Sequence, residues 1–212
     1  MKYDCIIFDC DGVLVDSEDI SNQILVDMAN GLGAQIDYQF AKETFVGKSL
    51  SSIFTYLEET IHRKLPESFE KEFRERTFEL FKTDLKPIEG IHALLDQLNV
   101  PICVASSGPK DKIKLNLETT GLLDKFQNRI YSSYEIDSWK PSPKLFLHAA
   151  QQMGFEPNQC AVVEDSPVGV EAGKNGGFDV FAFTKPNYRS SFESQGARVF
   201  FNMNELLALL NE

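Results

Sequence analysis

Short apolar runs alternate with longer amphipathic stretches over most of the 212-residue chain. Each run has the length of a buried strand, and its continuous apolarity is what a sheet covered on both faces requires. Strands that alternate with helices predict a parallel α/β sheet with right-handed crossovers. The predicted strands are residues 5–8, 101–105, 130–131, 160–163 and 180–183, and the predicted helices are residues 91–98, 110–119, 143–153 and 167–175.

One interval breaks this alternation and reads as successive amphipathic helices without a convincing strand. Apolar residues such as Ile24, Met28 and Leu32 recur there at near-helical spacing, which indicates a packed helical bundle. We therefore predict a Rossmann-like doubly wound parallel sheet core with an inserted α-helical domain. The core comprises residues 1–16 and 87–212, and the insertion comprises residues 17–86, with helices at 20–32, 38–45, 50–57 and 68–81.

Charge and composition narrow the possible partners. The net charge is −11 and no run of Lys or Arg occurs, so we expect no nucleic-acid partner. An acidic surface also repels phosphorylated ligands, which means that a phosphate site needs a local cation or placed donors. The N-terminal MKYDCIIFDCDG stretch and the rest of the chain lack apolar runs of signal or membrane-spanning length, so we expect a cytoplasmic protein without a membrane partner. The four cysteines form no CxxC pair, which indicates reduced, buried thiols.

Asp9, Asp11 and Gly12 directly follow the first predicted strand. In an open parallel sheet, ligands bind beyond the carboxyl ends of the strands. Two acids one residue apart offer hard oxygen ligands that suit Mg²⁺, and Gly12 lets the backbone turn sharply after them. The DxDG pattern also resembles the start of a calcium loop. Against calcium stand the apolar strand before it and Ile20 at the twelfth loop position, where such loops carry Glu.

Two further strand ends carry residues suited to an anion. Ser106, Ser107 and Gly108 follow the second predicted strand and offer a hydroxyl and backbone N–H groups, although Ser and Gly are equally common in turns and caps. Lys140 precedes Pro141, which favours a fixed, extended backbone. Most lysines are solvated surface charges, but a lysine held this way can neutralise a carboxylate and a transferring phosphate together.

Glu164 and Asp165 end another predicted strand, and Ser166 and Pro167 then begin a helix. Alone, an Asp-Ser-Pro stretch is usually only a helix cap. Together, however, the four strand ends place several carboxylates, one lysine and one serine at the same edge of one sheet. The sequence therefore predicts a single polar site at that edge.

In kind, order and spacing these motifs resemble the haloacid dehalogenase superfamily: DxDGxxxDS, a strand-end Ser, WKPxP and EDSxxG. The resemblance covers nearly the whole chain and extends to the β-phosphoglucomutase-like group of subfamily I, whose helical insertion is a cap domain. Within that group, the SxGP, YxxxxWKPxP and IEG stretches are most similar to phosphatases of 6-phosphogluconate. The resemblance implies a Mg²⁺-dependent phosphatase that hydrolyses a small phosphorylated metabolite, a sugar phosphate or sugar-acid phosphate, through an aspartyl-phosphate.

The resemblance also implies the roles of the acidic residues. Asp9 would be the nucleophile, and Asp11 would be the general acid and base. Asp9, Asp165 and the backbone carbonyl of Asp11 would hold Mg²⁺. Glu164 would be either a further metal ligand or a hydrogen-bond acceptor behind the ligands.

The phosphoryl oxygens would be bound by Ser106 and Lys140, as the same resemblance implies. Lys140 would also screen the repulsion between the nucleophile and the incoming phosphate. Ser107 and Gly108 stand beside Ser106 as substrate-binding candidates.

In the insertion, Gly47 and Lys48 resemble a cap loop that enters the active site, and Arg74 is a further candidate for substrate contact. The alternative for Lys48 and Arg74 is a solvated helix face. Mutases of the group carry a histidine where this chain has Ser21 and an arginine where it has Leu50. Hydrolysis is therefore the preferred activity, with a hexose-phosphate mutase as the alternative, and we expect a monomer.

Overall fold

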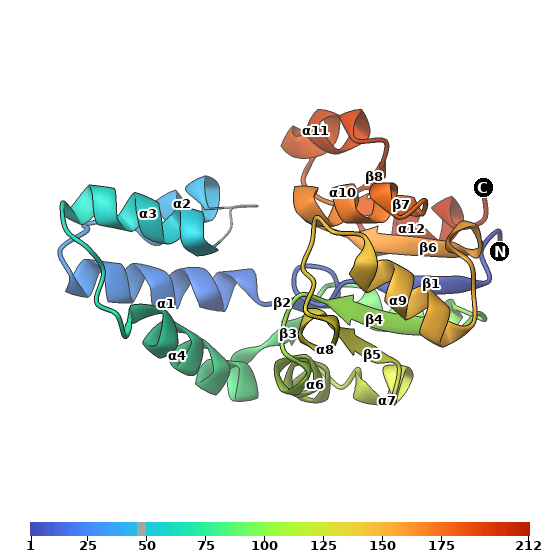
Figure 1. Cartoon of the computed structure of the whole chain (residues 1–212), viewed down its shortest axis with the longest axis horizontal. Coiled ribbons are helices and arrows are strands. Elements are labelled where there is room, and N and C mark those ends of the chain that lie inside the picture. Colours follow the sequence, from blue (N-terminus) through green and yellow to red (C-terminus); the bar gives the residue numbers. More distant parts are fainter. Residues whose placement is uncertain (46–49) are drawn as a thin grey trace. The chain divides into compact units, whose positions relative to one another are not determined.

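The computed structural model describes residues 1–45 and 50–212. The chain divides into two compact units, one formed by Met1–Asp16 with Lys86–Glu212 and the other by Ser17–Leu85. We call the first the sheet unit and the second the helical unit (Figure 1). Among the described residues, no helix combines the length and the apolarity needed to cross a membrane.

A six-stranded sheet forms the centre of the sheet unit, in the order β5-β4-β1-β6-β7-β8, and every neighbouring pair is parallel. All residues of the three adjacent strands β4, β1 and β6 are buried. Because water reaches neither face, these strands are apolar at successive positions and not only at alternate ones. The strands are β1 (Cys5–Phe8), β4 (Ile102–Ser106), β5 (Ile130–Ser132), β6 (Cys160–Glu164), β7 (Asp179–Phe183) and β8 (Arg198–Phe200).

Helices cover both faces of this sheet. Helices α9 (Lys144–Met153) and α10 (Pro167–Asn175) pack on one face, against alternate side chains such as Cys5 and Ile7 (Figure 1). On the opposite face, Phe8 meets Phe126 of α7, with ring centroids 6.2 Å apart. The other helices of the unit are α5 (Ile91–Gln97), α6 (Lys110–Thr119), α7 (Leu123–Phe126), α8 (Ser133–Ile136), α11 (Arg189–Ser194) and α12 (Met203–Leu209), with 3₁₀ turns η1 (Pro157–Gln159) and η2 (Pro186–Tyr188).

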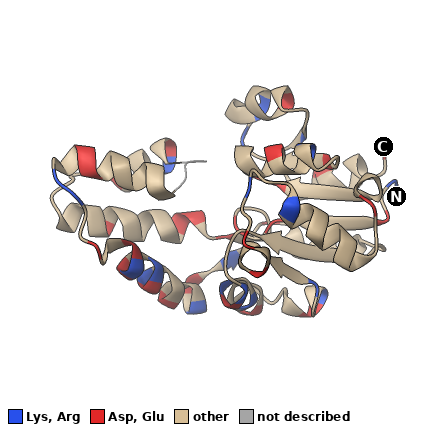
Figure 2. Cartoon of the chain, in the orientation of Figure 1, with Lys and Arg blue, Asp and Glu red and all other residues tan. Residues whose placement is uncertain are grey.

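The helical unit contains α1 (Glu18–Gly31), α2 (Tyr38–Thr44), α3 (Leu50–Ile61) and α4 (Phe69–Asp84). Its aromatic side chains form the core, where Phe54 packs edge to face on Phe69 and Phe73 at 5.4 and 6.4 Å between ring centroids. Figure 2 shows many Lys, Arg, Asp and Glu positions along α4, and ion pairs of this helix such as Arg74 with Glu70 have exposed side chains. The helical unit is therefore a small bundle with an apolar interior and a densely charged surface.

The predicted α/β fold with a parallel sheet is confirmed, and all five predicted strands are present. The sequence pattern did not predict β8, which is only three residues long and begins with an exposed arginine. It also missed the antiparallel pair β2 (Val15–Asp16) and β3 (Lys86–Pro87), at which the chain leaves and re-enters the sheet unit. Two-residue strands are defined by their partner and not by a pattern of their own.

Candidate active site

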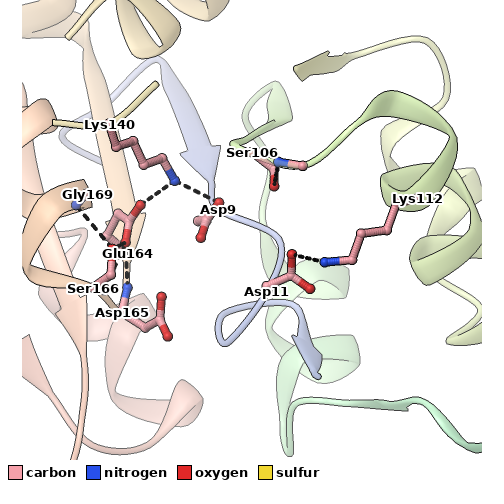
Figure 3. A network of polar contacts seen from close by, with 10 residues as sticks. Asp9, Asp11, Ser106, Lys112, Lys140, Glu164, Asp165, Ser166 and Gly169 are labelled. Atoms are coloured by element: carbon pink, nitrogen blue, oxygen red, sulfur yellow. Dashed lines mark hydrogen bonds and ion pairs between the residues drawn. The ribbon is translucent and has the colours of Figure 1, made fainter. Parts of the chain in front are cut away.

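Asp9 directly follows β1, which lies between β4 and β6 in the sheet. Its backbone N–H donates to the carbonyl of Val163 at 2.9 Å, which continues the parallel pairing one residue beyond the strand. The Asp9 side chain is buried, and Lys140 Nζ lies 2.8 Å from its Oδ1 atom (Figure 3). A carboxylate and an ammonium group are thus held together at the carboxyl end of the central strand.

Lys140 bridges two carboxylates. Its Nζ atom also lies 2.5 Å from Oε1 of Glu164, and its side chain is only 5% exposed. Burial by itself lowers the pKa of Lys140, but the charges of Asp9 and Glu164 outweigh this effect and raise the pKa above its ordinary value. Lys140 therefore remains a cation in the site. The bond between Lys140 and Pro141 is a cis peptide.

Glu164 is completely buried, and its carboxylate is surrounded by donors. Besides Lys140, its Oε2 atom accepts hydrogen bonds from the backbone N–H groups of Asp165 and Ser166 and from the Ser166 hydroxyl, at 2.9, 3.0 and 3.0 Å. A side chain on Gly169 would leave no room for this carboxylate, because a Cβ atom there would lie 1.9 Å from Glu164 Cδ. Of the two roles that the sequence left open for Glu164, these contacts favour the acceptor that holds Lys140 and the loop after β6.

Three carboxylates converge at this edge of the sheet. Ligand atoms of Asp9, Glu164 and Asp165 all lie within 4.8 Å of one another. Gly12 makes room for Asp165, since a Cβ atom on Gly12 would lie 1.9 Å from Asp165 Oδ2. Lys140 contacts two of these three acids, Asp9 and Glu164, in a largely buried place. A cluster of hard carboxylate oxygens fits a divalent cation such as Mg²⁺.

Crowding of these acids affects the protonation of Asp9. Burial raises the pKa of Asp9 to about 7, an increase that the positive charge of Lys140 opposes and the negative charge of Glu164 supports. Without a metal ion, the proton therefore competes for the same oxygen atoms that a cation would use.

Asp11 points its side chain to the other side of the site, as Figure 3 shows. Lys112 Nζ lies 2.8 Å from Asp11 Oδ2, and Asn116 Nδ2 donates to Asp11 Oδ1 at 3.3 Å. The negative charge of Asp11 raises the pKa of Lys112 in spite of the burial that lowers it. No sequence motif singles out Lys112 or Asn116. Their only signal is the four-residue spacing on the helix that follows Ser106.

Ser106 is buried at the end of β4, beside the end of β1. Its Oγ atom accepts from the backbone N–H of Gly108 at 3.2 Å, and the Ser132 hydroxyl donates to the carbonyl of Gly108 at 2.6 Å. Ser107 and Gly108 are partly exposed in the turn that leads into α6. This turn therefore presents a serine hydroxyl and backbone N–H groups at the same sheet edge as Asp9.

The remaining candidates for substrate contact belong to the helical part of the chain. Gly47 and Lys48 fall outside the described residues. Arg74 lies on α4, where its Nη2 atom is 2.7 Å from Oε1 of Glu70, and its side chain is 55% exposed. Within the helical unit, Arg74 is thus part of a solvated i,i+4 ion pair.

Residues 6–183 match the sequence profile of the haloacid dehalogenase-like hydrolases. The chain belongs to this family. The matched span contains all four motifs at the sheet edge, from Asp9 to Asp165. The predicted membership of the haloacid dehalogenase superfamily is therefore confirmed.

Relatives of this haloacid dehalogenase-like hydrolase cover nearly its full length. The 6-phosphogluconate phosphatase of Escherichia coli (strain K12) is 32% identical over 207 residues, or 97% of this chain and 93% of that protein. A haloacid dehalogenase-like protein of unknown function from Agrobacterium tumefaciens is similar in structure, with a TM-score of 0.90 at 32% identity over 99% of this chain and 98% of that one. A family hydrolase from Deinococcus radiodurans, solved with bound phosphate and sodium, has a TM-score of 0.84 at 29% identity over 99% and 95%. The prediction that this hydrolase is a phosphatase is confirmed at the level of the family.

Proposed function

We propose that this hydrolase is a Mg²⁺-dependent phosphatase of a small phosphorylated metabolite, with Asp9 as the nucleophile. The observation that carries the proposal is the position of Asp9. It is buried at the end of β1, 2.8 Å from a buried lysine, and its carboxylate oxygen lies within 4.8 Å of those of two further carboxylates. A lone carboxylate would repel a phosphate dianion, whereas this arrangement supplies a fixed cation and a set of metal ligands beside it.

In this proposal, an oxygen of Asp9 attacks phosphorus while the bond to the leaving oxygen breaks, which forms an aspartyl-phosphate. Asp11 gives its proton to the leaving oxygen and later takes one from the water that hydrolyses the aspartyl-phosphate. Asp9, Asp165 and the backbone carbonyl of Asp11 would hold Mg²⁺, which when bound supplies positive charge against the phosphoryl oxygens. Glu164 holds Lys140 in place.

Lys140 and Ser106 are the proposed phosphate-binding side chains. Lys140 can exchange its contact with Asp9 for a phosphoryl oxygen without leaving the site, because Glu164 retains it. Ser107 and Gly108 add a hydroxyl and backbone N–H groups in the turn that precedes α6. These donors satisfy the need for local attraction in a protein whose net charge is −11.

For the substrate, we propose a sugar phosphate or a sugar-acid phosphate, and 6-phosphogluconate is the first candidate. Support comes from the Escherichia coli relative of that name, which the chain matches over nearly its whole length. The helical unit is proposed as the cap that recognises the leaving group, with Gly47, Lys48 and Arg74 as candidate contacts. Ser21 and Leu50, in place of the histidine and arginine of mutases, favour hydrolysis over a hexose-phosphate mutase.

Incubation of the purified protein with Mg²⁺ and a panel of phosphorylated sugars and sugar acids tests this function by the release of inorganic phosphate. The Asp9→Asn variant should fold but lose at least roughly 10³-fold in rate, as expected when a nucleophile is removed. Asp4→Asn is a matched control, because Asp4 is an exposed carboxylate just before β1 that accepts a hydrogen bond from Gln159. Retained turnover in Asp9→Asn would contradict the proposal. Interconversion of 1- and 6-phosphates without release of phosphate would establish the mutase instead.

A further inference from the structure

The side chain of Asp11 is held by one face of a single helix. Lys112 and Asn116 are four residues apart on α6 and therefore lie on the same face. Lys112 Nζ contacts one carboxylate oxygen of Asp11 at 2.8 Å, and Asn116 Nδ2 contacts the other at 3.3 Å (Figure 3). Both oxygen atoms of Asp11 thus meet donors from the same helix.

The burial of Asn116 and the partial burial of Lys112 and Asp11 distinguish these contacts from a solvated surface ion pair. Asn116 is completely buried, although a buried amide is unfavourable unless its groups are hydrogen-bonded. Its Oδ1 atom has no hydrogen-bond partner among the described residues, while its Nδ2 atom faces Asp11. The Lys112 and Asp11 side chains are 27% and 31% exposed, so this ion pair is half-shielded from water. An apolar residue at position 116 would leave no unsatisfied oxygen, but it would also lack the Nδ2 group that donates to Asp11.

The site therefore contains two lysines with separate partners. Lys140 lies between Asp9 and Glu164, and Lys112 lies against Asp11. The three carboxylates with ligand atoms within 4.8 Å of one another are Asp9, Glu164 and Asp165, and the Asp11 side chain is not among them. An acid that joined this cluster would serve as a metal ligand and not as a proton donor to the leaving group.

We propose that Lys112, together with Asn116, is a positioning residue that directs the Asp11 carboxyl away from the acidic cluster and toward the leaving oxygen. This inference rests on the proposed phosphatase function. In the first step, the bond between Asp9 and phosphorus forms, the bond between phosphorus and the leaving oxygen breaks, and the Asp11 proton passes to that oxygen. In the second step, water attacks phosphorus, Asp11 takes a proton from it, and the bond between Asp9 and phosphorus breaks. Lys112 takes part in neither transfer and acts through Asp11.

The dependence of kcat/KM on the leaving group tests this role, because kcat/KM reports the first step. An alkyl phosphate, such as a sugar phosphate turned over by the wild type, needs a proton on its leaving oxygen, whereas 4-nitrophenyl phosphate releases a stable anion. Lys112→Met should lower kcat/KM for the alkyl phosphate by about 10- to 100-fold, as expected for a misplaced general acid. For 4-nitrophenyl phosphate the decrease should be no more than about threefold, since little proton transfer is required. Lys112→Arg keeps the charge and should recover part of the loss for the alkyl phosphate.

Lys110→Met is the matched control. Lys110 lies on the same helix and forms an ion pair of similar length, 2.7 Å against 2.8 Å, but with Glu135. For the Lys110→Met variant, the ratio of kcat/KM values for the two substrates should equal that of the wild type. In an Asp11→Asn background, Lys112→Met should have no further effect on this ratio, because the residue on which it acts is already gone.

Equal losses for both substrates in Lys112→Met, or no loss for either, would overturn the inference. Thermal unfolding of each variant separates a changed site from a changed fold. If the wild type releases phosphate from no substrate with Mg²⁺, the proposed function itself fails. If the wild type is active and the ratio of kcat/KM values is unchanged by Lys112→Met, only the role of Lys112 fails.

Discussion

In the sheet unit, Lys140 is 5% exposed and lies between Asp9 and Glu164, whereas in the helical unit Arg74 and Glu70 form an ion pair whose side chains are 55% and 52% exposed. Water and salt screen the exposed pair, so it contributes at most about 1 kcal/mol to the stability of the fold. The buried charges are expensive to desolvate, and they persist only with good geometry and saturated hydrogen bonds. Charged residues that a protein retains in such a place indicate chemistry and not stability.

Glycines of the two units show the same contrast. Gly169, in α10, has no room for a side chain because the Glu164 carboxylate occupies the space. Gly31 ends α1 of the helical unit, and outside its own helix backbone and chain neighbours no atom of the described residues lies within 4 Å of the place where a Cβ atom would stand. Of these two glycines, only Gly169, in the unit that carries the candidate site, has its backbone packed against a carboxylate.

Removal of the buried cation should have the largest effect. Lys140→Met leaves Asp9 and Glu164 without their shared partner, so we expect the free energy of unfolding to fall by about 3–5 kcal/mol. Phosphatase activity should fall by about 10²–10³-fold. Urea unfolding and phosphate release measure the two effects, and Lys140→Arg, which keeps the charge, should lose less stability.

Arg74→Met is the corresponding change in the helical unit and serves as a control for stability. Its free energy of unfolding should stay within about 0.5 kcal/mol of the wild type, because the ion pair with Glu70 is solvated. Similar losses of stability in Lys140→Met and Arg74→Met would break the contrast between the two units.

The second effect concerns the glycine behind Glu164. Gly169→Ala forces a methyl group into the place of the Glu164 carboxylate and should destabilise the fold by about 1–3 kcal/mol, as overpacked interiors do. Activity should fall as well, because Lys140 would lose its fixed partner. Gly31→Ala meets open space and should stabilise the helix by about 0.5–1 kcal/mol. A fully active and equally stable Gly169→Ala protein would show that Glu164 does not hold Lys140 in place.

The dependence of stability and Mg²⁺ affinity on pH probes the acidic cluster most directly. The pKa of Asp9 is raised from an ordinary 3.8 to about 7, so the metal-free fold binds a proton that the unfolded chain releases. This contribution to stability is complete below about pH 4 and is lost as the pH rises through about 7. Mg²⁺ needs the deprotonated carboxylate, so its affinity should increase between pH 6 and pH 8, by at most about tenfold per pH unit.

Thermal unfolding with and without Mg²⁺ measures this dependence. The stabilisation by Mg²⁺ should be larger at pH 8 than at pH 6, since the ion binds the folded state and competes with fewer protons there. A Mg²⁺ effect of the same size at both values would mean that the ion does not bind at Asp9.

The sequence predicts those site residues whose positions relative to the strands can be recognised along the chain. Asp9, Ser106, Glu164 and Asp165 each lie at or just after the end of an apolar run, and the parallel arrangement of those runs brings their ends to one edge. Lys140 stands beyond β5 and α8, so its contact with Asp9 depends on the tertiary structure. The end of an apolar run is a local feature of the sequence, so these positions can be predicted without the structure. The Glu164 contacts are local as well, but the choice between metal ligand and hydrogen-bond acceptor depends on donor geometry that no pattern carries.

By itself, the sequence determined the parallel α/β core, the inserted helices and the strand ends at which acids and a lysine gather, because burial on both faces of a sheet leaves a mark on every residue of a strand. Only the tertiary structure decided the partner of Asp11, since Lys112 lies 101 positions away and looks like an ordinary helical lysine. The same holds for Gly12 and Gly169, whose neighbours are carboxylates brought close by packing. Contacts between side chains from different elements depend on how those elements pack, and periodicity along one element contains no record of its neighbours.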